Sequence, residues 1–158
     1  MISYEKIEFT DKETFKYKLL KKKIYVMGIN MGEWKLLAPC GSIVAQCYGS
    51  AIVVYPEYMW DGCTVVGEKY EDEITLECSM LHDVLYNAKK NPEGIKVPFS
   101  LFTADKIFCD LMEVLYKKEH GSFFQKYIFP KLYLVGLWSI GLPWKFGKNQ
   151  YYTLKKMI

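Results

Sequence analysis

The sequence predicts an α+β protein with a small antiparallel sheet in its N-terminal third, followed by a helical layer. Short runs of β-branched and aromatic residues, separated by glycine and proline, occupy residues 24–55. After residue 73 the apolar residues instead recur with the spacing of a helix face. No repeat, low-complexity tract or linker interrupts the 158 residues. We therefore expect one domain over residues 1–158, with residues 1–67 mostly strands and loop and residues 73–141 helical.

Four strands are expected in the N-terminal third, at residues 24–27, 34–37, 43–45 and 51–55. Turn residues separate them, namely Gly28, Gly32, Pro39, Gly41 and Gly49. The segment from Tyr17 to Lys23 fits a strand or a helix equally well. Residues 56–67 contain Pro56, Asp61, Gly62 and Gly67, a composition that predicts an ordered loop.

Three helical segments are expected after this loop. The first begins near Glu73 and ends at residues 91–94, and its apolar stripe is Leu81, Val84, Leu85 and Ala88. The second is capped by Ser100 or Thr103 and ends at residues 120–122, and it can run antiparallel to the first. The third spans residues 123–140, where Pro130 marks a kink or a new first turn.

Composition narrows the classes of function. With 51% hydrophobic and 25% charged residues the chain fits a folded soluble protein, and a net charge of +3 is too small to predict a nucleic-acid partner. Five cysteines without a C-x-x-C pair give no support for zinc and favour reduced thiols. Charged residues in the first eleven positions argue against a signal peptide.

The longest largely apolar stretch runs from Leu132 to Trp144. It is too short for a transmembrane helix, which needs about 20 residues. Its first part, Leu132 to Trp138, is expected in the core. In a less favoured reading this part forms an interfacial lipid contact together with Trp144 and Lys145.

The residues with the clearest chemical potential lie on the first two predicted helices. Cys78, His82 and Tyr86 are spaced four apart and share one helix face, and Asp83 lies about 100° around the helix from His82. His82 can take a proton from water because an imidazole titrates near neutral pH. Asp105, on the next helix, is the best partner to orient the imidazole.

Two further roles complete this candidate site. Tyr86 can hydrogen-bond to the Asp105 carboxylate, and Asp83 can bind a hard cation together with loop carbonyls. Each residue also has a structural alternative: His82 at the edge of the core, Asp105 favoured by the helix macrodipole, Asp83 as an exposed acid, and Tyr86 as a core aromatic. The combination of all four favours a catalytic site.

The motif His82-Asp83-x-x-Tyr86, followed by Pro98-Phe99 and by Ala104-Asp105-x-x-Phe108, resembles the catalytic helices of the phospholipase A2 superfamily. The similarity is greatest to the capsid phospholipase of parvoviruses and covers residues 78–108. It implies that His82 is the general base, that Asp105 and Tyr86 orient it, and that Asp83 is a Ca²⁺ ligand. Where those enzymes have a glycine-rich calcium loop, this chain has Trp60-Asp61-Gly62, so Asp61 is expected as an additional Ca²⁺ ligand.

A second resemblance includes the segment Trp60-Asp61-Gly62-Cys63-Thr64 together with the two helical motifs. This pattern resembles an uncharacterised family of tailed phages and prophages, domain of unknown function 1353. The resemblance implies a phage protein found in the host cytoplasm or in the virion.

Two hypotheses of function follow. In the first, the chain is a phage-type, phospholipase-A2-like hydrolase whose His82/Asp105 dyad activates water for ester hydrolysis, with a phospholipid or membrane surface as its partner. In the second, the chain is a non-enzymatic virion component or host-interaction protein that binds other phage proteins. There the same residues would hold the helices together.

Overall fold

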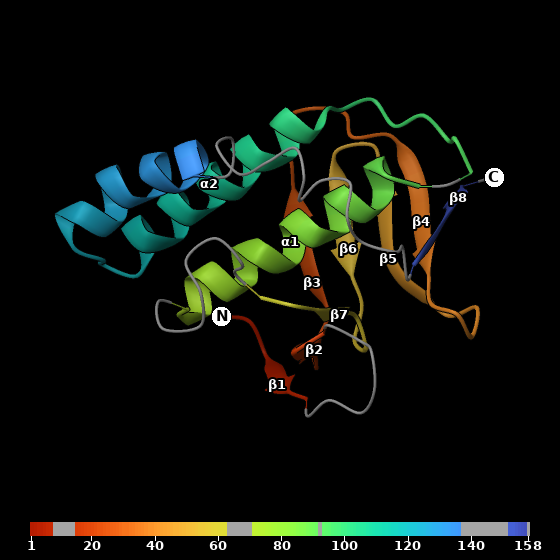
Figure 1. The fold of residues 1–158 in the computed structure, drawn as a ribbon, viewed down its shortest axis with the longest axis horizontal. Coiled ribbons are helices and arrows are strands. Elements are labelled where there is room, and N and C mark those ends of the chain that lie inside the picture. Colours follow the sequence, from red (N-terminus) through yellow and green to blue (C-terminus); the bar gives the residue numbers. More distant parts are fainter. Residues whose placement is uncertain (8–14, 63–70, 92, 137–151, 158) are drawn as a thin grey trace.

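The computed structural model describes residues 1–7, 15–62, 71–91, 93–136 and 152–157. Its antiparallel sheets come mainly from the N-terminal part of the chain and its helices follow, so the predicted α+β class is confirmed (Figure 1). The strands are β1 (Tyr4–Lys6), β2 (Tyr17–Leu19), β3 (Lys23–Val26), β4 (Glu33–Leu37), β5 (Ile43–Tyr48), β6 (Ala51–Val54), β7 (Met59–Trp60) and β8 (Thr153–Lys156).

The strands form two sheets where the sequence predicted one. The larger sheet has the order β3-β6-β5-β4-β8 and contains all four predicted strands. The smaller has the order β1-β2-β7, which settles the ambiguous segment after Tyr17 as a strand. Strand β7 lies inside the segment predicted as a loop, and β8 joins the large sheet from the far end of the chain. These short strands carry little apolar pattern, so only their pairing identifies them.

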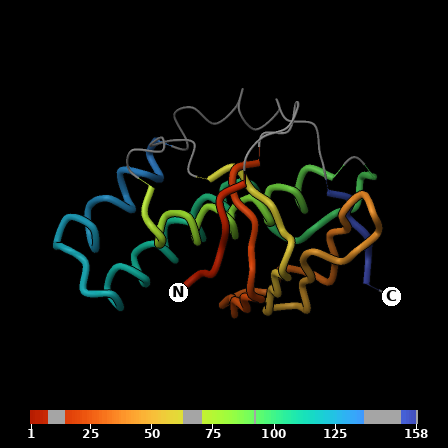
Figure 2. The backbone as a smooth tube through the Cα atoms, turned by 90° about the horizontal axis from the view of Figure 1, so that it is seen from below, coloured from red at the N-terminus to blue at the C-terminus, as the bar shows by residue number. Residues whose placement is uncertain are grey.

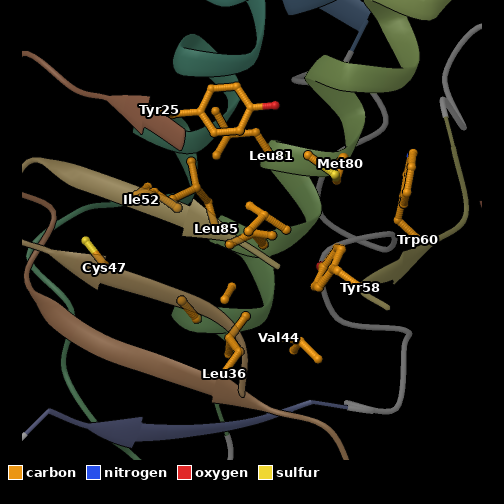
Figure 3. Packing of buried hydrophobic residues seen from close by; sticks show 14 of the residues in the cluster. Tyr25, Leu36, Val44, Cys47, Ile52, Tyr58, Trp60, Met80, Leu81 and Leu85 are labelled. Atoms are coloured by element: carbon orange, nitrogen blue, oxygen red, sulfur yellow. The ribbon is translucent and has the colours of Figure 1, made fainter. Parts of the chain in front are cut away.

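The main core lies between the large sheet and helix α1 (Glu73–Lys89). The predicted apolar stripe of α1 is fully buried, and Leu81 and Leu85 pack towards Ile52 of β6 (Figure 3). Tyr58 and Trp60 close the same core from the side of the small sheet, next to Met80. Burying each large side chain of this kind contributes about 1.5–3 kcal/mol, which fixes the orientation of α1 on the sheet.

Helices α1 and α2 (Leu101–Lys118) begin at side-chain caps. Asp72 and Thr75 form a capping box at the start of α1, and the Ser100 hydroxyl accepts from the Thr103 amide at the start of α2. After α2, His120 adopts a left-handed backbone with φ of 56°, consistent with the predicted end of that helix.

The two helices run antiparallel (Figures 1 and 2). The start of α2 meets the middle of α1, where Asp105 contacts His82. At the other end of the pair, the Tyr116 hydroxyl donates to Asp72, the N-cap of α1, at 2.7 Å. The first contact joins predicted site residues of the two helices, and the second holds the other end of the helix pair together.

The third helical segment covers residues 123–136, and residues 137–140 of the prediction lie outside the described part of the chain. It contains the π-helical element η2 (Phe124–Ile128), where the Phe129 amide donates to the Phe124 carbonyl. Pro130 lies two residues after the end of η2 and has no amide hydrogen to give to the helix. A wider π turn before the proline relieves the clash of its ring with the preceding turn, so Pro130 lies inside the helix.

Candidate active site

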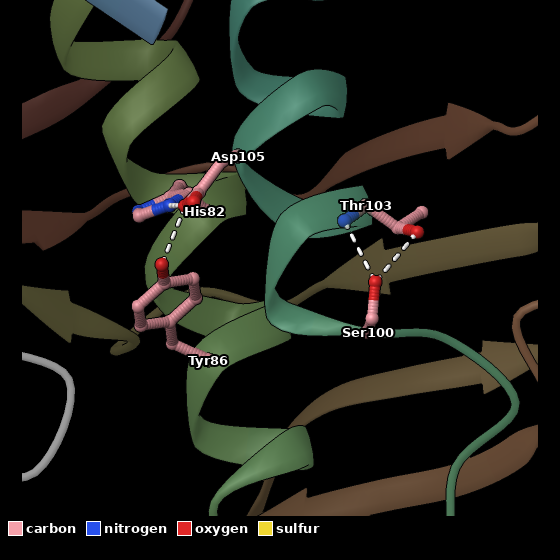
Figure 4. A network of polar contacts seen from close by, with 5 residues as sticks. All are labelled: His82, Tyr86, Ser100, Thr103 and Asp105. Atoms are coloured by element: carbon pink, nitrogen blue, oxygen red, sulfur yellow. Dashed lines mark hydrogen bonds and ion pairs between the residues drawn. The ribbon is translucent and has the colours of Figure 1, made fainter. Parts of the chain in front are cut away.

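Three of the predicted site residues meet between α1 and α2 (Figure 4). His82 and Tyr86 lie one turn apart on α1, and Asp105 faces them from α2. His82 Nε2 lies 2.8 Å from Asp105 Oδ1, and the Tyr86 hydroxyl donates to the same oxygen at 2.5 Å. The predicted contacts of Asp105 with the imidazole and with the tyrosine are therefore present.

Asp105 is completely buried. Because α2 begins at Leu101 and has no acidic residue in its first turn, Asp105 lies in the second turn, one turn later than expected. The helix macrodipole acts within the first turn, so it does not explain this carboxylate. Its two hydrogen bonds to α1 compensate the cost of burying it.

The hydrogen bonds of Asp105 fix the tautomer of His82. A carboxylate only accepts hydrogen bonds, so Nε2 of the imidazole is the donor. In neutral His82 the other ring nitrogen, Nδ1, then carries a lone pair. This is the arrangement in which an imidazole can receive a proton while a carboxylate stabilises the imidazolium that forms.

Nδ1 of His82 is open to solvent. Among the described residues, no group hydrogen-bonds to it. Yet in this same part of the chain every fully buried side-chain nitrogen and oxygen has a hydrogen-bond partner. Nδ1 is therefore not fully buried, and the His82 side chain as a whole is 11% exposed.

Aromatic rings hold the imidazole on two sides. The Tyr86 ring lies 4.1 Å from the imidazole, centroid to centroid, and the edge-on Phe108 ring lies at 5.3 Å. Phe108 in turn stacks on Tyr133 at 4.7 Å. These contacts restrict rotation of the imidazole and keep Nε2 aimed at Asp105.

Tyr86 acts as a fixed hydrogen-bond donor. Burial raises the pKa of its phenol, and the hydrogen bond to Asp105, the charge of Asp105 and the charge of Asp83 raise that pKa further. The phenol therefore stays protonated over the physiological pH range and can donate to Asp105 throughout.

The two candidate cation ligands, Asp83 and Asp61, come from α1 and from the residue after β7. Asp83 is half-buried on the helix, and its carbonyl accepts from the Asn87 side chain. Asp61 is buried just after β7. The charges of both raise the pKa of the fully buried Tyr58 phenol, after the larger effect of burial, so both carboxylates lie near Tyr58.

A calcium site needs six to eight oxygen ligands, several of them usually carboxylates. In the described ranges, no three His, Cys, Asp or Glu side chains cluster closely enough to hold a metal. Asp61 and Asp83 alone do not fit such a site, and residues 63–67 of the loop expected to supply carbonyl ligands lie outside the described residues. Calcium binding at this place stays a prediction.

The sequence places Phe108 in the apolar stripe of the second helix and in a motif, and does not predict its contact with the imidazole. Its position follows from its spacing, because residues three apart on a helix share a face and Asp105 and Phe108 are so spaced. Cys78, one turn before His82, is fully buried. Of the other described cysteines, Cys40 is an exposed free thiol, Cys47 is a buried free thiol, and Cys109 is buried.

The apolar segment after Pro130 is only partly in the core, contrary to prediction. Tyr133 is buried, but Leu132 and Val135 are each 56% exposed. Trp144 and Lys145 lie outside the described residues. Within the described ranges, no helix has the length and apolarity to cross a membrane.

Comparisons with models of protein families, with curated proteins and with solved structures found no match. The resemblances to phospholipase A2 and to the phage family therefore rest on the motif residues, and both stay predictions.

Proposed function

We propose that this chain is a hydrolase in which His82 activates a water molecule to cleave an ester, with a lipid ester as the substrate class. The single observation that carries the proposal is the asymmetry of the imidazole: Nε2 is bound to the buried Asp105, while Nδ1 is open to solvent. The order of the motif residues, resembling phospholipase A2, supports the choice of a lipid ester.

The proposed reaction follows from this geometry. Water bound at Nδ1 attacks the ester carbonyl carbon, and its proton passes to Nδ1. The imidazolium is stabilised by Asp105 through Nε2, and Tyr86 keeps that carboxylate in place. When the tetrahedral intermediate collapses, Nδ1 returns the proton to the leaving alkoxide oxygen, giving an acid and an alcohol. No step in this scheme uses calcium.

His82→Gln tests the proposal. The Gln amide nitrogen can take the place of Nε2 as a donor to Asp105, but it cannot accept a proton from water. Hydrolysis of a phospholipid or of a simple soluble ester should fall by roughly 10²–10⁴-fold, the usual contribution of a positioned base, while the melting temperature changes little. Wild-type protein without ester turnover would overturn the proposal.

The matched control is His120→Gln. His120 is the other histidine of the chain and is exposed after the end of α2. Its substitution removes an imidazole of the same kind without touching Asp105, so turnover should be kept. Equal losses in the two variants would mean that the effect does not come from the dyad.

A second candidate function is a non-enzymatic phage virion or host-interaction protein. The observation that favours it is the complete burial of Asp105, whose two hydrogen bonds join α1 to α2. On this reading wild type has no turnover, and His82→Ala lowers the melting temperature because Asp105 loses a buried donor, at a cost of about 1–3 kcal/mol.

A further inference from the structure

The helix of residues 123–136 exposes an unusually apolar surface. It lies beside α2 at the end of the molecule away from the large sheet, and is blue in Figures 1 and 2. Six of its large apolar side chains are between 40% and 71% exposed: Phe123, Phe124, Tyr127, Ile128, Leu132 and Val135. We call these six residues the aromatic face. Such a concentration of exposed apolar side chains marks an interaction surface.

The segment that carries the aromatic face has basic residues and no acidic ones. From Gly121 to Gly136 the chain carries Lys126 and Lys131 and no acidic residue. At the end of α2, Lys117 lies over the Tyr127 ring at 4.9 Å, and Lys118 is exposed beside it. The acids nearby are Glu113, which is paired with Lys117, and Glu119, Asp72 and Glu73, which line a pocket together with Gly121 and Gln125 at the start of this helix. Exposed aromatic and aliphatic side chains among lysines are typical of helices that lie on anionic lipid.

The opposite face of this helix is connected to the His82/Asp105 dyad through contacts between aromatic rings. Tyr133 is 4% exposed and stacks on Phe108, and the Phe108 ring meets the His82 imidazole. Two ring contacts therefore separate the candidate base from the helix whose outer side is apolar. A surface on which this helix rests would lie close to the dyad.

We propose that the aromatic face docks the protein on an anionic lipid surface. A second copy of the chain is a poorer occupant, because a symmetric contact would bring the lysines of both copies together. An anionic surface instead offers opposite charge to the lysines and an apolar layer for the phenyl rings. The proposal deepens the proposed function and rests on it for the lipid being substrate as well as support.

The experiment is co-sedimentation with vesicles of phosphatidylcholine alone and of phosphatidylcholine mixed with phosphatidylglycerol. It uses full-length His82→Gln protein, so that hydrolysis does not alter the lipid. The protein should bind the anionic vesicles more strongly than the neutral ones. Phe123→Ser/Phe124→Ser should weaken that binding by about tenfold or more, because two exposed phenyl groups no longer enter the lipid.

The matched control is Ile24→Ser/Val26→Ser, which removes two exposed apolar side chains from β3, 57% and 79% exposed. It should bind the vesicles like its parent. The proposal is overturned if the parent binds neither vesicle, or if both double variants bind equally. It is also overturned if light scattering finds a dimer that Phe123→Ser/Phe124→Ser converts to a monomer.

The two proposals fail separately. If wild type shows no ester hydrolysis but vesicle binding depends on Phe123 and Phe124, the hydrolase proposal falls and the docking surface stands. If vesicles are not bound but a soluble ester is hydrolysed in a His82-dependent manner, the docking surface falls and the hydrolase proposal stands.

Discussion

Helix α1 takes part in two buried triads that look alike and differ in one respect. In the first, Glu77 accepts from the Tyr25 hydroxyl at 3.0 Å and pairs with Lys23 at 2.8 Å. In the second, Asp105 accepts from the Tyr86 hydroxyl and from His82 Nε2. Each brings together a carboxylate, a phenol and a nitrogen-bearing side chain, and each joins α1 to another element.

The two triads differ in whether the nitrogen-bearing side chain keeps a hydrogen-bond acceptor after it has bound the carboxylate. The Lys23 ammonium group has donors only, and one of them is taken by Glu77. The imidazole of His82 gives its proton-bearing nitrogen to Asp105 and keeps an acceptor nitrogen that solvent can reach. A buried carboxylate beside a tyrosine is therefore no mark of catalysis by itself. The open second nitrogen distinguishes the candidate site from a structural cross-link.

The sharpest test of this distinction compares Asp105→Asn with Glu77→Gln. Both changes remove a buried negative charge and keep an acceptor oxygen. Asp105→Asn should lower ester turnover by roughly 10²–10⁴-fold, because the imidazolium loses its stabilising charge, whereas Glu77→Gln should leave turnover unchanged. Steady-state kinetics at neutral pH measures both. Equal losses of turnover would mean that the two triads do not differ in function.

The free energy of unfolding should differ less between variants of the two triads than ester turnover does. Asp105→Ala leaves the His82 and Tyr86 donors without their acceptor, at a cost of about 1–3 kcal/mol. Glu77→Ala should cost less, because Lys23 is 24% exposed and can turn to water. Urea unfolding of the two variants and wild type tests the order. A larger loss of unfolding free energy in Glu77→Ala than in Asp105→Ala would contradict this prediction.

Alkaline pH should affect both triads in the same direction. Burial is the largest cause that raises the pKa of Tyr25 and of Tyr86 above the ordinary value of 10.0. A raised folded-state pKa contributes stability that is complete below pH 10 and is lost as pH rises beyond it. Each tyrosine should contribute a slope of up to about 1.4 kcal/mol per pH unit.

Urea unfolding between pH 9 and pH 11 measures this loss. Tyr25→Phe and Tyr86→Phe should each remove one tyrosine's share of the slope. A slope unchanged in either variant would show that its phenol is not held protonated by the fold.

Calcium should have the smallest effect. We expect binding near Asp83 and Asp61 only in the range of about 10⁻⁴–10⁻³ M, because few carboxylates are available. Calorimetry with Ca²⁺ on wild type and on Asp83→Asn checks this, and Glu73→Gln, which alters an acid at the start of the same helix, serves as the control. No heat at millimolar Ca²⁺ would remove calcium from the account.

The sequence predicted best those elements whose formation depends on residues close together in the chain. Helices α1 and α2 have apolar stripes and end signals within a few residues of their boundaries, and the His82–Asp105 contact follows once they pack antiparallel. Strands β7 and β8 are short, and their partners β2 and β4 lie far away in sequence. Such strands are defined by pairing and not by local pattern.

Prediction of the site was limited in the same way, because contacts between different helices are not visible in a local sequence pattern. The motif named His82, Tyr86 and Asp105, but spacing alone could not say which imidazole nitrogen would meet the carboxylate. Likewise, the apolar residues around Leu132 were predicted in the core because helical apolarity usually means burial. The structure leaves one face of that helix exposed, and only the arrangement of α2 beside it decides which face.

The most direct test of the central claim is a ¹H–¹⁵N correlation spectrum of the imidazole side chains of the neutral protein. With only two histidines, and with His120→Gln to assign them, the spectrum of His82 can be read alone. We expect a neutral ring with its proton on Nε2 and an unprotonated Nδ1. A proton on Nδ1 with a bare Nε2 would contradict it, because the nitrogen that water reaches could then no longer accept a proton.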